Sequence, residues 1–162
     1  MKKYLLIVSS VLTFVYASSF MISSHTGDEV PYPEGYRKWT HIKTGLIGPQ
    51  DPSFKFVGGF HHIYANEKAM EGYLTGNFPD GAILVFDVLE ANEKNSNQTE
   101  GKRKHIDVMI RDSAKYSDTG GWGYEEFKEG LASARVLTPV IKTQCFTCHS
   151  KQSDHVFSDF RK

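Results

Sequence analysis

The chain has 162 residues, and its 19 basic and 19 acidic side chains leave no formal net charge. Such a chain lacks the positive excess with which proteins bind nucleic acid electrostatically, so no nucleic-acid partner is expected. Its 40% apolar content is too high for a disordered protein, and its length suits a single domain. Two cysteines, Cys145 and Cys148, are too few for a disulfide scaffold.

The N-terminus has the pattern of a secretory signal peptide. Two lysines precede an apolar run from Tyr4 to Tyr16, and small residues lead to a predicted cleavage site after Ala17. We predict a signal peptide over residues 1–17 and a periplasmic location. Its removal takes two of the 19 basic side chains and leaves a net charge of −2. The alternative is an uncleaved segment that tethers the protein to a membrane, because the weakly apolar run extends to Ile22.

The next part of the chain is predicted to be a flexible linker, residues 18–32, followed by one folded domain over residues 33–162. The three-to-four spacing of Tyr36, Trp39 and Lys43 predicts a short helix that ends before Gly45. The aromatic run over residues 54–64 predicts a strand with a bulge or bend at Gly58-Gly59.

A second helix is predicted from Asn66, as its N-terminal cap, to Gly76, with an apolar stripe along one side. The Pro-Asp-Gly turn at residues 79–81 leads into residues 82–89, which are apolar on both faces and predict a central strand. Residues 90–104 are polar throughout and predict a solvated hairpin loop.

The alternation of apolar and polar residues over 106–111 predicts a half-buried strand, and a short helix is predicted around residues 125–131. Strands separated by short helices and turns, without a repeated strand–helix–strand unit, favour an α+β fold. The expected architecture is a mainly antiparallel β-sheet with a few short helices.

The motif that carries chemistry is Cys145-Phe146-Thr147-Cys148-His149, whose C-x-x-C-H spacing is that of covalent haem c attachment. On one helical turn the two thiols can reach the two vinyl groups of a porphyrin. The adjacent imidazole of His149 is then placed as the proximal iron ligand. One haem c per chain is therefore predicted.

Two other readings of the cysteine pair compete with haem attachment. A redox disulfide favours a C-x-x-C at the start of a helix in a thioredoxin-like pattern, which this C-terminal pair lacks. A zinc site needs a fourth ligand besides Cys145, Cys148 and His149, and His155 does not have a recognised ligand spacing.

Several segments together resemble the cytochrome P-460 and cytochrome c′-beta family. They are Tyr36 to Trp39, the Gly76 to Gly81 run, the Val108 to Gly123 segment, and Cys145 to His149 followed by Val156-Phe157. The resemblance covers the chain from about Pro33 to the C-terminus. It implies a mostly antiparallel sheet, a haem held by the C-terminal segment, a proximal histidine and a homodimer.

The chain departs from the cytochrome P-460 branch at one position. In that branch a lysine of the strand after the Pro-Asp-Gly turn is cross-linked to the porphyrin and supports hydroxylamine oxidation. The corresponding residue here is Phe86, which has no nucleophile, so the chain is closer to the c′-beta branch with its apolar distal side. The resemblance predicts that Phe86 faces the haem, whereas alternation alone is equally satisfied by an ordinary core aromatic.

His61 and His62 are adjacent on a predicted strand, so their side chains point to opposite faces. His62 shares a face with Phe60 and Tyr64 and is the predicted pocket residue, although a hydrogen-bonded core histidine fits the same pattern. Met70 and Met109 are candidate axial ligands, although each also fits an apolar stripe or a strand position. The side chains of Arg111, Asp112 and Lys115 are candidates for contact with the haem propionates or for proton delivery, although ordinary surface charge fits the same pattern.

The favoured function is an exported mono-haem c-type cytochrome that binds a small ligand such as nitric oxide in an apolar distal pocket. The alternatives are a redox enzyme that oxidises hydroxylamine or a related small nitrogen compound, and a plain electron-transfer cytochrome with a redox partner protein. Spectra of the reduced protein distinguish the three, because they differ in the sixth iron ligand and in the porphyrin itself.

Overall fold

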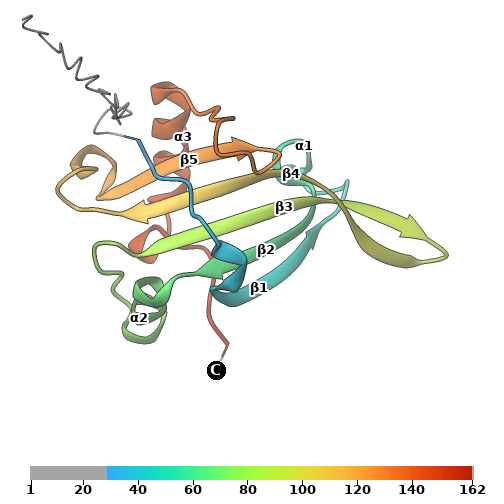
Figure 1. Ribbon diagram of the computed structural model, residues 1–162, viewed down its shortest axis with the longest axis horizontal. Coiled ribbons are helices and arrows are strands. Elements are labelled where there is room, and N and C mark those ends of the chain that lie inside the picture. The colour runs from blue at the N-terminus through green and yellow to red at the C-terminus, as the bar shows by residue number, and fades with distance from the viewer. Residues whose placement is uncertain (1–28, 162) are drawn as a thin grey trace, which may run out of the picture.

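A computed structural model describes residues 29–161 of the chain. The predicted signal peptide and most of the predicted linker therefore lie outside the described residues. Five strands form one antiparallel sheet whose spatial order follows the chain order, β1 to β5 (Figure 1). The α+β, mainly antiparallel fold predicted from the sequence is confirmed. The strands are β1 (Thr40–Ile47), β2 (Gly59–Ala65), β3 (Ile83–Lys94), β4 (Asn97–Arg111) and β5 (Trp122–Lys128).

The helices are short and lie between or after the strands. They are the α-helices α1 (Phe54–Val57), α2 (Glu67–Thr75) and α3 (Pro139–His149), and the 3₁₀ turns η1 (Tyr36–Lys38), η2 (Ser117–Thr119) and η3 (Ser153–His155). Within the described part of the chain, no helix combines the length and the apolar composition needed to cross a membrane.

The helix predicted over residues 36–43 is wrong beyond its first turn. Only η1 forms there, and the chain then enters β1, which pairs with β2 along its length. Ile42 is buried while both its neighbours are exposed, which is the pattern of a strand at the sheet edge. Pairing with β2 therefore overrides the local three-to-four spacing.

The segment predicted as one bent strand over residues 54–64 is two elements. Its first part is α1, and the strand β2 begins only at Gly59. Gly59 has a φ of +111°, and a Cβ there would meet the carbonyl oxygen of Leu89 on the neighbouring strand. The two glycines do bend the chain as predicted, but they separate a helix from a strand.

The helix α2 forms as predicted, with Asn66 as its N-cap and Gly76, in the left-handed conformation, as its C-cap. The Asn66 side-chain oxygen accepts hydrogen bonds from Ala69 N at 2.9 Å and from Ile83 N at 3.0 Å. One side chain thus caps α2 and ties it to the start of β3. A cap of this kind contributes about 1 kcal/mol to stability.

The polar stretch predicted as a loop over residues 90–104 is instead the two arms of a long hairpin. β3 and β4 remain paired out to Lys94 and Asn97, and Asn95 and Ser96 form the turn with φ values of 53° and 61°. Two left-handed turn residues match the right-handed twist of the paired strands. The hairpin projects well beyond the rest of the sheet in Figure 1, so its polar side chains have no core to face.

The helix predicted around residues 125–131 is wrong, because residues 122–128 form β5. All four residues from Gly123 to Glu126 pair with β4, and Phe127 is fully buried. The sheet therefore takes this segment as its second edge, and the chain turns only after Lys128.

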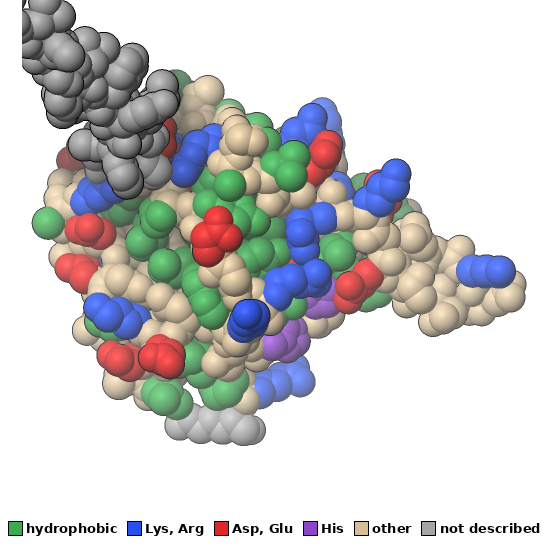
Figure 2. Space-filling view, viewed as in Figure 1, with side chains coloured by type: hydrophobic (Ala, Val, Ile, Leu, Met, Phe, Trp, Pro, Cys, Tyr) green, Lys and Arg blue, Asp and Glu red, His purple; other side chains and the backbone are tan. Residues whose placement is uncertain are grey.

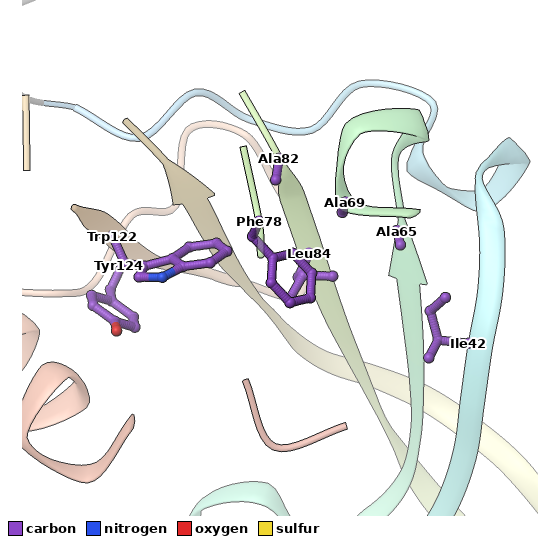
Figure 3. Close-up of a cluster of buried hydrophobic side chains, with 8 residues drawn as sticks. All are labelled: Ile42, Ala65, Ala69, Phe78, Ala82, Leu84, Trp122 and Tyr124. Atoms are coloured by element: carbon purple, nitrogen blue, oxygen red, sulfur yellow. The ribbon is translucent and has the colours of Figure 1, made fainter. Parts of the chain in front are cut away.

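The sheet carries a hydrophobic cluster on each face. The first, on the side of α2 and α3, is drawn in Figure 3; its buried members are Ile42, Ala65, Ala69, Phe78, Ala82, Leu84, Trp122 and Tyr124. The second lies under the N-terminal segment; its buried members are Val30, Tyr36, Val85, Ile106, Val108 and Phe127. On the molecular face shown in Figure 2, acidic and basic side chains are interspersed.

A fully buried carboxylate, Asp87, ties the N-terminal segment to the sheet. It accepts hydrogen bonds from the Tyr36 hydroxyl at 2.8 Å and from Arg103 Nε at 2.7 Å, and Arg37 Nε lies 3.6 Å away. Burial, together with the bond to Asp87, raises the pKa of Tyr36. A buried charge with this many donors is strongly paired, and its loss leaves the donors without their acceptor.

We expect Asp87→Ala to lower the free energy of unfolding by about 3 kcal/mol, because the buried network loses its only anion. This loss of about 3 kcal/mol is at the low end of the range for breaking a buried ion pair. The reason is that the side chains of Arg37 and Arg103 can turn towards water once Asp87 is removed. Urea denaturation followed by circular dichroism measures it. Asp118→Ala, at an exposed position on η2, is the control and should change stability by less than about 0.5 kcal/mol. Equal stability of the two variants would show that the network contributes nothing.

Candidate functional site

The helix α3 presents both cysteines and the adjacent histidine. Thr138 caps its N-terminus by accepting a hydrogen bond from Ile141 N at 3.4 Å, and Pro139 occupies the first turn, where a missing N–H costs nothing. Cys145 and Cys148 are three residues apart and hence lie on one side of the helix. Both are free thiols; Cys145 is half-buried and Cys148 is exposed. The helical turn expected of the motif is present.

The imidazole of His149 is oriented by a backbone carbonyl. His149 Nδ1 donates a hydrogen bond to His155 O at 2.8 Å, so the neutral ring keeps Nε2 as its unprotonated nitrogen. The ring of Phe157 meets it edge-on at 4.9 Å, and the ring of Tyr124 lies at 5.4 Å. Burial lowers the pKa of His149, which favours the neutral form that a metal requires.

A second buried carboxylate, Glu125, attaches α3 to the edge strand β5. Its oxygens lie 3.1 Å from Lys142 Nζ on α3 and accept a hydrogen bond from Leu137 N at 3.2 Å. Arg135 NH1 approaches the same group at 3.5 Å. The sequence analysis did not single out Glu125, because the segment was predicted to be a short helix and not a strand. The feature that marks Glu125 is its position on β5 directly opposite the buried Val108 on β4, which appears only once the two strands are paired.

Phe86 lies on the sheet face that α3 covers. Residues directly opposite one another in antiparallel strands share a face, and Phe86 pairs with Ile63 on β2 and with Asp107 on β4. Asp107 is close enough to Cys145 to contribute to raising the pKa of that thiol, after burial as the main cause. The position of Phe86 thus agrees with the predicted direction of its ring, while its contact with a haem stays a prediction.

His62 does not share that face. Its Nδ1 is bonded to the Thr44 hydroxyl at 2.8 Å, and its Nε2 lies 2.8 Å from a Glu100 oxygen. His62 pairs with Asp87, on the side of the N-terminal segment. The structure therefore places His62, the predicted pocket residue, on the sheet face that α3 does not cover. The alternation was correct, but Phe60 and Tyr64, which suggested a pocket, belong to the other face.

The adjacent His61 takes the place predicted for His62. Its ring stacks on Phe86, with centroids 4.7 Å apart and planes inclined by 23°. It occupies the space where a Cβ at Gly45 would lie, so the glycine on β1 makes room for it. Burial lowers the pKa of His61, and its buried Nδ1 has no hydrogen-bond partner among the described residues. A neutral imidazole with an unused nitrogen thus borders Phe86.

Two carboxyl groups beside Phe86 were missed by the sequence analysis. Asp107 on β4 and Glu126 on β5 are direct cross-strand partners on the face of α3. Removal from water, and then the charge of Glu126, raise the pKa of Asp107 well above its usual value. Burial also raises the pKa of Glu126. His105 Nε2 lies 3.6 Å from Asp107, and burial lowers the pKa of His105 to about 4. This corner of the site therefore favours the neutral form of each of these three groups.

The remaining sequence candidates have structural contacts. Met70 and Met109 pack against the first hydrophobic cluster. The Arg111 guanidinium lies over the Trp122 ring, at 5.6 Å from its centroid, and Lys115 Nζ donates to Glu29 O. Asp112 accepts a hydrogen bond from Lys115 N. A surface cavity of about 520 Å³ lies near Leu46, Phe54 and Ala91, and no residue of the C-x-x-C-H motif lines it.

In a comparison with protein families, the model of the family described as cytochrome P460 matches residues 33–158. The chain belongs to the cytochrome P460 family. A search of curated proteins found no match to the chain. The family resemblance seen in the sequence motifs is thereby confirmed, and the cytochrome P460 family implies a haem.

The residues of this cytochrome P460 chain fit a haem. Two free thiols three residues apart on one helix suit two thioether links, and His149 has its Nδ1 bonded so that Nε2 is available to iron. His155 offers its carbonyl to His149, while its ring stacks on Phe146 at 5.6 Å. Stacking does not occupy the ring nitrogens, and the buried Nδ1 of His155 has no hydrogen-bond partner among the described residues. The family match, which implies a haem, is what disfavours the four-ligand zinc site.

We expect Asp107→Asn to change the pH dependence of stability. The raised pKa means that the folded protein binds this proton more tightly than the unfolded chain does. The contribution of Asp107 to the free energy of unfolding is therefore fully present below about pH 4 and is lost as the pH rises towards its raised native pKa. Asparagine does not titrate and has no such loss. The free energy of unfolding of the variant, relative to that of the wild type, should therefore increase from pH 4 to pH 8. Urea denaturation of the haem-loaded protein measures this.

The control for Asp107→Asn is Asp118→Asn at an exposed site. Its stability should follow the wild-type curve across the same pH range. A constant difference between Asp107→Asn and wild type from pH 4 to pH 8 would contradict the raised pKa.

Proposed function

We propose that this protein is an exported mono-haem c-type cytochrome that binds a small uncharged ligand such as nitric oxide. The observation that carries the proposal is the hydrogen bond from His149 Nδ1 to His155 O, on the helix that also bears the paired thiols. When bound, the haem supplies an iron that takes up a diatomic ligand and exchanges an electron. The residues of the chain decide which ligand reaches it.

On the proximal side, the proposed roles follow from contacts already present. Cys145 and Cys148 hold the porphyrin as thioethers, and His149 presents Nε2 to the metal. The edge-on ring of Phe157 and the ring of Tyr124 restrict rotation of the imidazole. The buried Glu125 fixes the helix that carries all three ligating groups. The ligand geometry is therefore built before any small molecule binds.

On the distal side, we assign Phe86 as the aromatic cap. Its ring and the stacked His61 form a surface that excludes water and offers no charge, which favours an uncharged diatomic over a polar substrate. The resemblance to the cytochrome P-460 branch places a cross-linking lysine at this position, and phenylalanine cannot form that link.

A second candidate function is oxidation of hydroxylamine or a related small nitrogen compound. The observation that favours it is the Asp107–Glu126 pair on the same sheet face as Phe86, with the pKa of both carboxyls raised. A carboxyl whose pKa is raised is a better proton donor and acceptor for such a reaction than an ordinary surface carboxyl, and oxidation of an N–H bond requires proton transfer. The cross-linking lysine of the relatives is absent, so we rank this function second.

The expected partners follow from the same proposal. A ligand-binding cytochrome of the periplasm exchanges electrons with a redox partner protein, and the family resemblance implies a homodimer. Size-exclusion chromatography with light scattering measures the dimer. Fractionation of cells with intact and cleaved N-termini distinguishes periplasmic release from membrane tethering.

We expect covalent haem to depend on both thiols and its spectrum to depend on His149. The Cys145→Ser/Cys148→Ser double variant should lose haem staining on a denaturing gel, because no thioether remains. His149→Ala should keep the staining but change the spectrum of the reduced protein. In the wild type, a high-spin ferrous spectrum that responds to nitric oxide or carbon monoxide supports ligand binding.

Other spectra of the wild type would overturn the proposed function. A red-shifted Soret band from a modified porphyrin would favour the hydroxylamine-oxidising enzyme, and a low-spin spectrum indifferent to both gases would favour a plain electron carrier. Retention of covalent haem in the double serine variant would remove the thiols from their role.

We expect Phe86→Ala to open the distal side. Water and a sixth ligand gain access, so the rate of nitric oxide or carbon monoxide binding should change about tenfold, equivalent to about 1.4 kcal/mol in the barrier. Because Phe86 is only half-buried, the loss of stability should fall below the 3–5 kcal/mol or so found for fully buried aromatics. Stopped-flow flash photolysis measures the rates. Phe60→Ala, at a half-buried position on the sheet face that α3 does not cover, is the matched aromatic control and should leave ligand entry nearly unchanged. Unchanged rates in Phe86→Ala, with the fold intact by circular dichroism, would place Phe86 away from the iron.

A further inference from the structure

The turn that follows α3 has an unusual backbone. Asp154 and His155, in η3, have φ values of 46° and 65°, in the left-handed region that residues with a Cβ seldom occupy. Two such residues in succession persist only where the surrounding structure holds them, and they concentrate at functional sites. The turn lies five residues beyond His149, so its strain is adjacent to the proposed iron ligand.

One tie that holds the turn is the side chain of Asp154. Its Oδ2 accepts a hydrogen bond from Phe78 N at 2.7 Å, across 76 positions of sequence. Phe78 is itself firmly placed: its ring lies 5.1 Å from the ring of Tyr73 and 5.7 Å from that of Trp122. A Cβ at Gly72 would collide with the Phe78 ring, so α2 is shaped to receive it. The carboxylate thus anchors the turn to the first hydrophobic cluster.

A second tie comes from the neighbouring residue. The His155 ring stacks on Phe146, inside the C-x-x-C-H motif, with planes inclined by 21°. With its ring held on one side and the preceding carboxylate on the other, the His155 carbonyl is aimed at His149 Nδ1. The left-handed conformation therefore places the His155 carbonyl oxygen within hydrogen-bond distance of His149.

We propose that Asp154 is a positioning residue for the proximal ligand: by fixing the His155 carbonyl it sets the basicity of His149 and the reduction potential of the haem. The inference rests on the proposed role of His149 as the iron ligand. A hydrogen bond donated from Nδ1 makes the imidazole a stronger electron donor, which stabilises the ferric state. Release of the turn weakens that bond and raises the reduction potential.

The experiment compares variants of the full haem-loaded protein by potentiometric titration and by the iron–histidine stretching frequency in resonance Raman spectra. Asp154→Gly removes the carboxylate but tolerates the left-handed backbone, so it tests the tie without adding strain. We expect about a tenfold shift of the ferric–ferrous equilibrium towards ferrous, a rise of about 59 mV for one electron, and a lower stretching frequency. Asp154→Asn keeps a weaker, neutral acceptor and should fall between glycine and wild type in both measurements.

Two control variants separate the loss of the Asp154 hydrogen bond from effects of left-handed backbone and of lost charge. Glu129→Ala puts alanine at another left-handed position, φ 55°, in the loop after β5, and it should leave both measurements at wild-type values. Asp159→Asn removes a charge from the same C-terminal segment without touching the turn's hydrogen bond, and it should leave the stretching frequency unchanged.

The inference is overturned if Asp154→Gly and Asp154→Asn both keep the wild-type potential and stretching frequency. It is also overturned if the potential rises while the frequency stays constant, because that result is a simple effect of lost charge. Should Asp154→Gly fail to take up haem, an unchanged frequency in Asp154→Asn overturns the inference alone. The wild-type protein could lack covalent haem or use an axial ligand other than His149. Either result contradicts the proposed function and not the anchoring of the turn by Asp154.

Discussion

The attachment of α3 to the edge strand β5 is the constraint on which the candidate site depends. The helix follows a loop, and two of its own residues, Cys145 and Phe146, pack against the first hydrophobic cluster. Glu125, only 3% exposed, holds the helix in that position through Lys142 and the backbone of Leu137. A buried carboxylate carries a large desolvation cost unless its partners are in place, so it also penalises any arrangement in which the helix lifts away. As a consequence, the sheet face that α3 covers, which carries Phe86, is the proposed distal wall.

How much of this could be predicted from the sequence depends on the range of the interactions involved. The caps of α2, the C-x-x-C-H helix and the central strand β3 follow from neighbours within a few residues, and these predictions agree with the structure. The edge strands β1 and β5 were predicted as helices, because their patterns are short and only pairing with a neighbouring strand selects the extended form. The polar arms of the long hairpin were misread as a loop for the same reason: their strand form depends on cross-strand bonds and not on burial.

The candidate site shows the same limit at the level of single residues. Alternation correctly separated His61 from His62, but which face α3 would cover is decided by residues more than 60 positions away, including Glu125. Asp107 was hidden for a related reason. Ile106 and Val108, the neighbours of Asp107 in β4, are buried on one face of the sheet. From the sequence alone, the side chain of Asp107 is therefore expected to point to the other face, into water. Here that other face is covered as well, since the sheet has a hydrophobic cluster on each side. A sheet covered on both faces thus turns an apparently solvated acid into a group whose pKa is raised.

The two sides of the proposed haem site then place opposite demands on the protein. On the proposed distal side, the Phe86 ring and the stacked His61 suit uncharged ligands, and the raised pKa of Asp107 favours its uncharged form there. On the proposed proximal side, the bond from His149 to His155 O would increase electron donation to a bound iron, and the strained turn holds that bond in place. Phe78 connects the two, because its backbone N–H anchors the turn and its ring packs on Trp122, the first residue of the strand that carries Tyr124 and Glu126. A single cluster of side chains therefore supports both the donor strength of the proximal ligand and the sheet face that selects what binds opposite it.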